Sequence, residues 1–98
     1  MEKIYLVYDE YSCEGAECRC VIPCATMEVA VRKIKVLLEW YLKNTYLDLY
    51  VDDNLNVNEN ELFEYDIWEI DEDSVEIFIA DKNISLNLHI AESDVIDE

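Results

Sequence analysis

The stretch TMEVAVRKIKVLLEWYLKN, residues 26–44, decides the fold of this chain of 98 residues. Its apolar side chains recur at steps of three and four residues from Ala30 to Leu42, so on a helix they form one broad stripe. Thr26 stands just before the stripe, where its hydroxyl can accept a hydrogen bond from a free amide of the first turn. The pattern predicts a helix over Met27–Asn44 whose apolar stripe packs against a sheet.

Two strand signals precede the helix. Lys3–Tyr8 is apolar on both faces, which favours a central position in the sheet. Residues 9–17 contain the only glycine, Gly15, and have the polarity of a hairpin connection. A second strand is expected at Cys18–Ile22, ending at Pro23, which has no amide hydrogen to donate to a neighbouring strand.

Three further strand signals follow the helix. Residues 45–61 are expected to form a polar loop, because no apolar period runs through them. Leu62–Ile70, Ser74–Ala80 and Ile84–Ile90 then alternate apolar and polar side chains, and short polar connections join them. These strands should form an antiparallel meander, followed after Ala91 by a weakly held tail.

The element order ββαβββ predicts one α+β domain over residues 1–98. An antiparallel sheet of about five strands would carry one helix packed on one face. The alternation within the last three strands then places acids and aromatic rings together on the uncovered face. That face is expected to carry Glu64, Asp66, Trp68, Glu76, Phe78, Asn87 and His89.

The net charge of −17 is unevenly distributed along the chain. Residues 1–46 hold seven acids against six bases, whereas residues 47–98 hold seventeen acids against Lys82 alone. The acidic half still alternates apolar and polar residues, so its acids should coat a folded surface. Four of the bases lie on the exposed side of the predicted helix: Arg32, Lys33, Lys35 and Lys43.

No stretch has the length and apolar character of a membrane span or a signal peptide. Charged residues interrupt even the most apolar stretch, Val29–Leu42. We therefore predict a cytoplasmic protein that does not bind membranes.

All four cysteines lie in SCEGAECRCVIPC, residues 12–24. Cys18, Cys20 and Cys24 share one parity, so on a strand they point the same way and would form a row of buried thiols. We expect these three to react slowly with thiol reagents, and Cys13, taken as exposed, to react faster. Two alternatives are a zinc site, although the spacing is not a usual zinc pattern, and a redox or disulfide role that involves Cys13.

The chain carries no recognisable enzyme motif. One glycine excludes a glycine-rich phosphate loop, and one histidine, His89, leaves no metal triad or evident general base. The alternating Asp and Asn residues from Asp52 onward are similar to a calcium-binding EF-hand loop. Val57 and Phe63, however, occupy the positions that need glycine and glutamate. We predict no enzymatic activity, catalytic residue, cofactor or metal.

An acidic surface with aromatic rings repels nucleic acid and attracts proteins that bind it. We therefore expect a protein partner with a basic nucleic-acid-binding groove, and no direct binding of nucleic acid. The aromatic side chains would anchor the contact and the carboxylates would orient it. The predicted partner-binding residues are Glu64, Asp66, Trp68, Glu69, Asp71, Glu72, Asp73, Glu76 and Phe78.

The stretches KIYLVYDEY (residues 3–11), CVIPCATMEVAVRKI (20–34) and YDIWEI (65–70) resemble those of small phage proteins with a strand, strand, helix, strand order. The short, acidic chain as a whole also resembles accessory proteins of phages and mobile elements. Among these are DNA-mimic inhibitors of the anti-CRISPR and anti-restriction kinds. The resemblance implies an inhibitor that acts in the host cytoplasm, and it carries over no functional residues.

Two other classes of function stay open. The chain could be a regulatory or adaptor protein whose acidity confers solubility. It could also be a homodimer whose uncovered faces pair around Trp68 and Phe78, with the acids at the rim.

Overall fold

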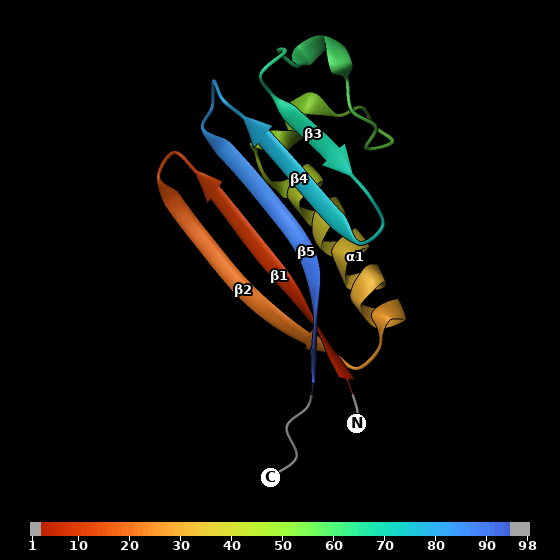
Figure 1. Ribbon diagram of the computed structural model, residues 1–98. Coiled ribbons are helices and arrows are strands. Elements are labelled where there is room, and N and C mark those ends of the chain that lie inside the picture. The colour runs from red at the N-terminus through yellow and green to blue at the C-terminus, as the bar shows by residue number, and fades with distance from the viewer. Residues whose placement is uncertain (1–2, 95–98) are drawn as a thin grey trace.

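A five-stranded antiparallel sheet with α1 against one face makes up residues 3–94, the part of the chain that the computed structural model describes (Figure 1). The strand order is β2-β1-β5-β4-β3, so the first and last strands of the described residues pair with each other inside the sheet. The predicted α+β fold and its ββαβββ order are confirmed. The elements are β1 (Lys3–Cys13), β2 (Ala16–Cys24), α1 (Met27–Asn44), β3 (Ile67–Ile70), β4 (Ser74–Ile79) and β5 (Ile84–Asp94).

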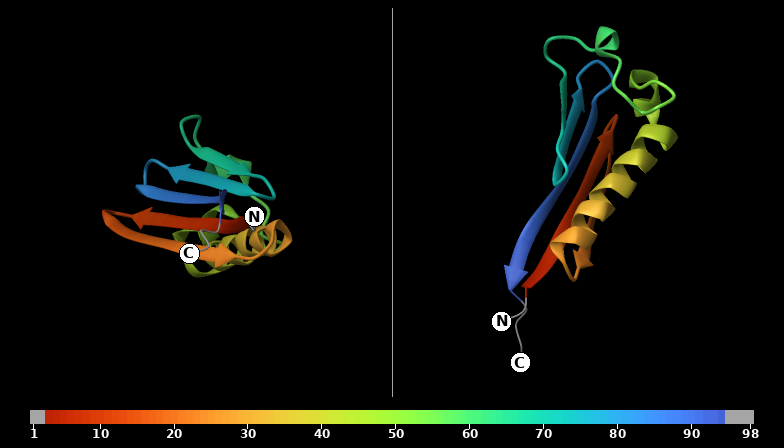
Figure 2. Two further views of the ribbon diagram at one scale, coloured as in Figure 1. Left: turned by 60° about the horizontal axis from the view of Figure 1, so that its bottom comes forward. Right: turned by 90° about the vertical axis from the view of Figure 1, so that its right-hand side faces the viewer.

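Helix α1 begins and ends where the sequence predicts. The Thr26 hydroxyl accepts a hydrogen bond from the Val29 amide at 3.2 Å and so caps the first turn. Figure 2 shows the helix lying along one face of the sheet. The buried side chains of α1 and of the sheet form one core, which includes Val7, Ala30, Ile34, Leu42, Val75, Ile77, Ile79, Ile84, Leu86 and Leu88.

The connection between β1 and β2 is much shorter than predicted. Glu14 and Gly15 form a tight two-residue turn, with φ angles of 51° and 89°. Two positive φ angles in succession match the twist of paired strands, so the hairpin continues up to this turn. The prediction of a connection over residues 9–17 was therefore too wide, although the glycine does lie at the turn.

Strand β2 continues through Pro23, where the sequence predicts its end. β2 lies at the edge of the sheet, and Pro23 stands opposite Leu6 of β1. An edge strand tolerates proline because the missing amide hydrogen can point away from the neighbouring strand.

The last three strands form the predicted meander, but their bounds differ, and β4 ends at Ile79, one residue before the predicted end. β3 covers only Ile67–Ile70 of the predicted Leu62–Ile70. β5 continues to Asp94, which stands opposite Lys3 of β1. The weakly held tail was therefore the wrong prediction for residues 91–94, and residues 95–98 lie outside the described part.

Residues 45–61 are more structured than the predicted polar loop. Two short 3₁₀ helices, η1 (Tyr46–Tyr50) and η2 (Glu59–Glu61), and a bridge between Val51 and Val57 shape this segment. Leu47 and Tyr50 of η1 are buried in the core. The segment therefore forms part of the packing at one end of the molecule.

The molecule is elongated, with extents of 51 × 29 × 23 Å. Its radius of gyration of 14.8 Å exceeds the value of about 13 Å expected for a compact domain of this length. Within residues 3–94, no helix combines the length and apolar character that a membrane crossing requires.

Candidate functional site

An acidic edge runs along one side of the sheet. We define it as Glu69 on β3, Glu76 on β4, and the turn Asp71–Asp73 between them. Glu69 stands directly opposite Glu76 in the strand pairing, and the three turn residues are exposed. Directly opposed like charges destabilise a strand pair, so the arrangement weakens the sheet unless a cation approaches it.

No base within the described residues pairs with the acidic edge. The ion pairs of residues 3–94 are Lys3–Glu92, at 3.4 Å, and Arg32–Glu28, at 4.0 Å, and both lie elsewhere. The charges of the acidic edge are therefore available to a cationic surface from outside.

Two of the predicted partner-binding acids lie away from the acidic edge. The chain turns at residues 64–65, just before β3, so Glu64 and Asp66 are at the opposite end of that strand from the turn Asp71–Asp73. Glu64 is exposed there. Asp66 is partly buried, and its carboxylate accepts hydrogen bonds from the amides of Phe63 and Ala80, each at 3.0 Å. The predicted row of solvated carboxylates at Glu64 and Asp66 is therefore wrong.

The predicted aromatic anchors lie on opposite faces of the sheet. Phe78 is half-buried on the uncovered face, the same face as Glu76, as predicted. Trp68 stands opposite the buried Ile77, and its ring centroid lies 6.4 Å from that of Tyr50. Trp68 therefore packs against the core on the helix side, and its predicted place on the uncovered face is wrong.

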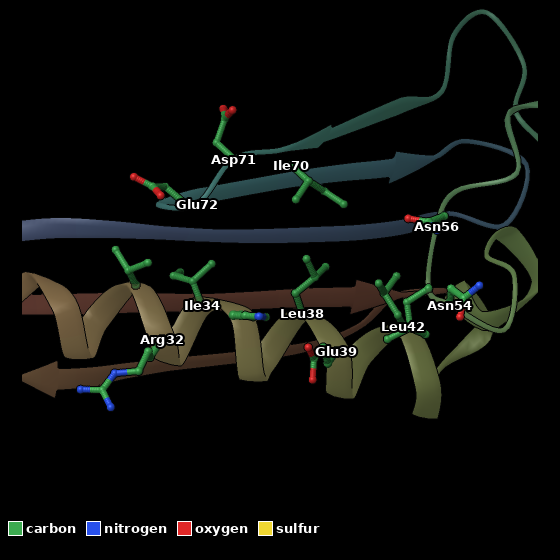
Figure 3. Close-up of a pocket in the computed structure, with 13 residues that line it drawn as sticks. Arg32, Ile34, Leu38, Glu39, Leu42, Asn54, Asn56, Ile70, Asp71 and Glu72 are labelled. Atoms are coloured by element: carbon green, nitrogen blue, oxygen red, sulfur yellow. The ribbon is translucent and has the colours of Figure 1, made fainter.

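A groove between α1 and β3 borders the acidic edge (Figure 3). Its volume is about 820 Å³. Ile34, Leu38 and Leu42 of the helix line it together with Ile70 of β3, whose side chain is 44% exposed. Charged residues from both sides also line it, with Arg32, Lys35 and Glu39 on the helix and Asp71 and Glu72 at the turn.

Sequence reasoning missed this groove. The alternation within β3 places Ile70 on the same face as Trp68, but it does not reveal that the helix leaves Ile70 partly uncovered. Ile70 can therefore offer an apolar contact directly beside the acidic turn.

The four cysteines are free thiols with different degrees of burial. Cys18 and Cys20 lie on the helix-facing side of β2, as their shared parity predicts, yet both are exposed. Cys24 is buried and Cys13 is half-buried. The predicted row of buried thiols therefore holds only for Cys24, and the prediction of an exposed Cys13 is wrong.

Thiol reactivity should follow this burial. With a water-soluble aromatic disulfide reagent, we expect Cys18 and Cys20 to be labelled first, Cys13 later and Cys24 only after unfolding. Partial desolvation, the neighbouring Cys18 and the Asp9 carboxylate raise the pKa of Cys20, so its labelling should accelerate at alkaline pH. Mass spectrometry of peptides after timed labelling checks the order, and labelling of Cys24 as fast as Cys18 in the folded protein would contradict it.

A buried polar pair ties the helix to the sheet beside these thiols. Asp9 is buried on β1, and its carboxylate accepts a hydrogen bond of 2.6 Å from the Tyr41 hydroxyl of α1. The pKa of Tyr41 is raised, chiefly by burial and further by the hydrogen bond to Asp9 and the negative charge of the Asp9 carboxylate. The pair stabilises one packing position of the helix.

Residues 3–94 contain no group of three or more His, Cys, Asp or Glu side chains placed to hold a metal ion. In the segment similar to an EF-hand loop, the Asp52 carboxylate accepts hydrogen bonds from the amides of Asn54 and Asn56, at 2.9 and 3.0 Å. These contacts shape the local turn.

Comparison of the chain with models of protein families, with curated proteins and with solved structures finds no match.

Proposed function

We propose that the protein is an acidic inhibitor that binds a nucleic-acid-binding partner, such as a CRISPR or restriction nuclease, and occupies its basic nucleic-acid surface. The unpaired acidic edge is the observation that supports this proposal most directly. Its carboxylates follow one another along β3, the turn and β4, and none forms an ion pair with a base among residues 3–94. A groove lined by Lys and Arg would relieve their mutual repulsion.

The size and charge of the molecule also support mimicry of nucleic acid. Duplex DNA as long as the 51 Å axis of the protein carries about 30 phosphate charges, at one per ~1.7 Å. The net charge of −17 is about half of that number. A basic groove that accommodates a duplex would therefore meet a body of similar length and the same sign of charge.

The contact would be anchored beside the acidic edge. Ile70 in the groove takes the anchoring role that the sequence assigns to Trp68, because Trp68 is packed against the core. Phe78 provides a second apolar contact on the uncovered face. Buried apolar anchors contribute most to affinity, whereas exposed charges mainly steer association.

Assays of DNA cleavage by a panel of CRISPR and restriction nucleases test the proposal. The protein should slow one class of nuclease, excess DNA should restore cleavage, and the protein should bind neither DNA nor RNA. Added salt should weaken the inhibition because it screens exposed charges. If an inhibited nuclease still bound DNA with unchanged affinity, occupation of its nucleic-acid surface would be refuted.

Reversal of charge at the turn should weaken this inhibition. We expect Asp71→Lys with Glu72→Lys to reduce affinity for the nuclease at least about tenfold at low salt, because each exchange replaces attraction by repulsion. Both side chains are exposed, so the melting temperature should change little.

The matched control is Glu61→Lys with Glu64→Lys. It makes the same change in net charge at the other end of β3, where both side chains are also exposed. Equal losses for the two pairs would show that only total charge matters. A larger loss for Lys33→Glu with Lys35→Glu on α1 would make the basic helix the binding surface instead.

A further inference from the structure

Strand β2 has an unusually exposed environment for its composition. Only Cys24 of its nine residues is buried, while Cys18 and Cys20 are exposed on one face and Val21 is 53% exposed on the other. Thiols and valine are among the side chains most often buried in proteins. β2 is also an outer strand of the sheet, so a further strand can pair along its free edge and cover part of these exposed side chains.

The tight turn determines which backbone amides and carbonyls of β2 point toward this free edge. In a two-residue hairpin the closing pair, Cys13 with Ala16, is hydrogen-bonded, and bonded and non-bonded pairs then alternate. The β2 residues whose backbone groups point away from β1 are therefore Glu17, Arg19, Val21 and Pro23. Pro23 has no amide hydrogen, so Glu17, Arg19 and Val21 keep both a donor and an acceptor for an added strand.

The charges on β2 favour one pairing of two copies, because it alone places Glu17 opposite Arg19. If Glu17 lies opposite Arg19 of the second copy, the two-fold axis generates the same ion pair again, and the two backbone pairs exchange four hydrogen bonds. A shift of two residues would place Arg19 opposite Arg19 of the second copy, which is unfavourable. The selected pairing also places Cys18 directly opposite Cys18 of the second copy.

The distribution of charge across the sheet also favours contact at this edge. β2 and β3 are the two outer strands of the sheet, and the acidic edge lies on the β3 side. β2 belongs to residues 1–46, whose acids and bases nearly balance. Two copies that meet at β2 therefore keep their acidic edges far apart and free for a partner.

We propose that two copies of the chain form an antiparallel dimer along β2, with Glu17 opposite Arg19 of the second copy and Cys18 opposite Cys18. The two five-stranded sheets then continue as one. This interface does not depend on the proposed inhibition of a nuclease.

Disulfide trapping tests the pairing. Diamide, which takes up the two thiol hydrogens as a disulfide forms, should link the dimer through Cys18, because Cα atoms of a non-hydrogen-bonded pair lie about 4.5 Å apart. Cys18→Ala should abolish the link, whereas Cys20→Ala should retain it, since Cys20 lies opposite Ala16 of the second copy. A link between two Cys20 residues, or no link at any protein concentration, would overturn the proposal.

Exchange of the two charges provides an independent test without oxidation. Glu17→Arg alone and Arg19→Glu alone each place like charges opposite each other twice, so the dimer should dissociate about tenfold more readily in sedimentation equilibrium. The double variant, Glu17→Arg with Arg19→Glu, should restore much of the affinity. Circular dichroism checks that each variant is folded. A monomeric parent protein would contradict the pairing, and so would a double variant that dimerises as weakly as the single variants.

Discussion

Replacement of Tyr41 by phenylalanine is expected to lower the free energy of unfolding by about 2–3 kcal/mol at neutral pH. The substitution removes the hydroxyl that donates to Asp9 and leaves a buried carboxylate without this partner. Urea unfolding followed by circular dichroism measures the effect. Tyr46→Phe is the control, because the Tyr46 side chain is 62% exposed, and it should change the free energy by less than about 0.5 kcal/mol.

The same variant should change the response to alkaline pH. The pKa of Tyr41 is raised in the folded protein above its ordinary value of 10.0, so the folded state holds the phenolic proton more tightly than the unfolded state. The resulting stabilisation is complete below pH 10 and is lost as the pH rises from there toward the folded-state pKa.

Stability of the parent protein should therefore fall above pH 10, and that of Tyr41→Phe should fall less steeply. Part of the decline should persist in the variant, because burial also raises the pKa of Tyr50. Identical alkaline slopes for the two proteins would show that Tyr41 does not supply the effect.

Asp66→Ala should destabilise the protein by about 2 kcal/mol, the second largest effect that we expect. Its carboxylate accepts hydrogen bonds from the Phe63 amide in the turn before β3 and from the Ala80 amide at the end of β4. Loss of both bonds leaves the partly buried amide of Ala80 without this acceptor. Thermal unfolding measures the change.

Glu64→Ala is the control for Asp66. Glu64 is exposed two residues away, so this change should leave the free energy of unfolding within about 0.5 kcal/mol of the parent value. If Asp66→Ala were equally harmless, the carboxylate would not hold the start of β3 in place, and a role for Asp66 in partner binding would be open again.

The helix and the buried side of the sheet were predictable because their patterns are local. Thr26 provides a start signal next to an apolar stripe, and the helix follows both. Val75, Ile77 and Ile79 alternate with more polar neighbours, so their face toward the helix follows from strand geometry alone.

The start and orientation of β3 were not predictable in the same way. Leu62–Ile70 has apolar side chains on both faces, so its alternation does not decide which face is covered. The Asp66 carboxylate bonds to the Phe63 amide and stabilises a turn where a longer strand was expected. Neither strand propensity nor the alternation of apolar residues distinguishes this turn from a continued strand.

The candidate site was predictable in its charge and not in its shape. The excess of acids after residue 46 and the turn at Asp71–Asp73 are visible in the sequence. The exposure of Cys18 and Cys20 depends on where the helix crosses the sheet, and so does the exposure of Ile70 in the groove. The alternation along a strand predicts the face to which a side chain points. Whether that side chain is buried depends on how elements distant in the sequence pack over the face.

The pairing of β1 with β5 has a consequence for synthesis of the protein on the ribosome. Tyr5 finds its β5 neighbour, Glu92, only after the chain has been translated through residue 92. Until then β1 has β2 on one side and nothing on the other, and β4 lacks one of its neighbours as well. Contacts so distant along the chain form slowly, and the waiting strands present open edges to other nascent chains. A chaperone that shields β1 and β4 until β5 emerges would therefore increase the yield of folded protein.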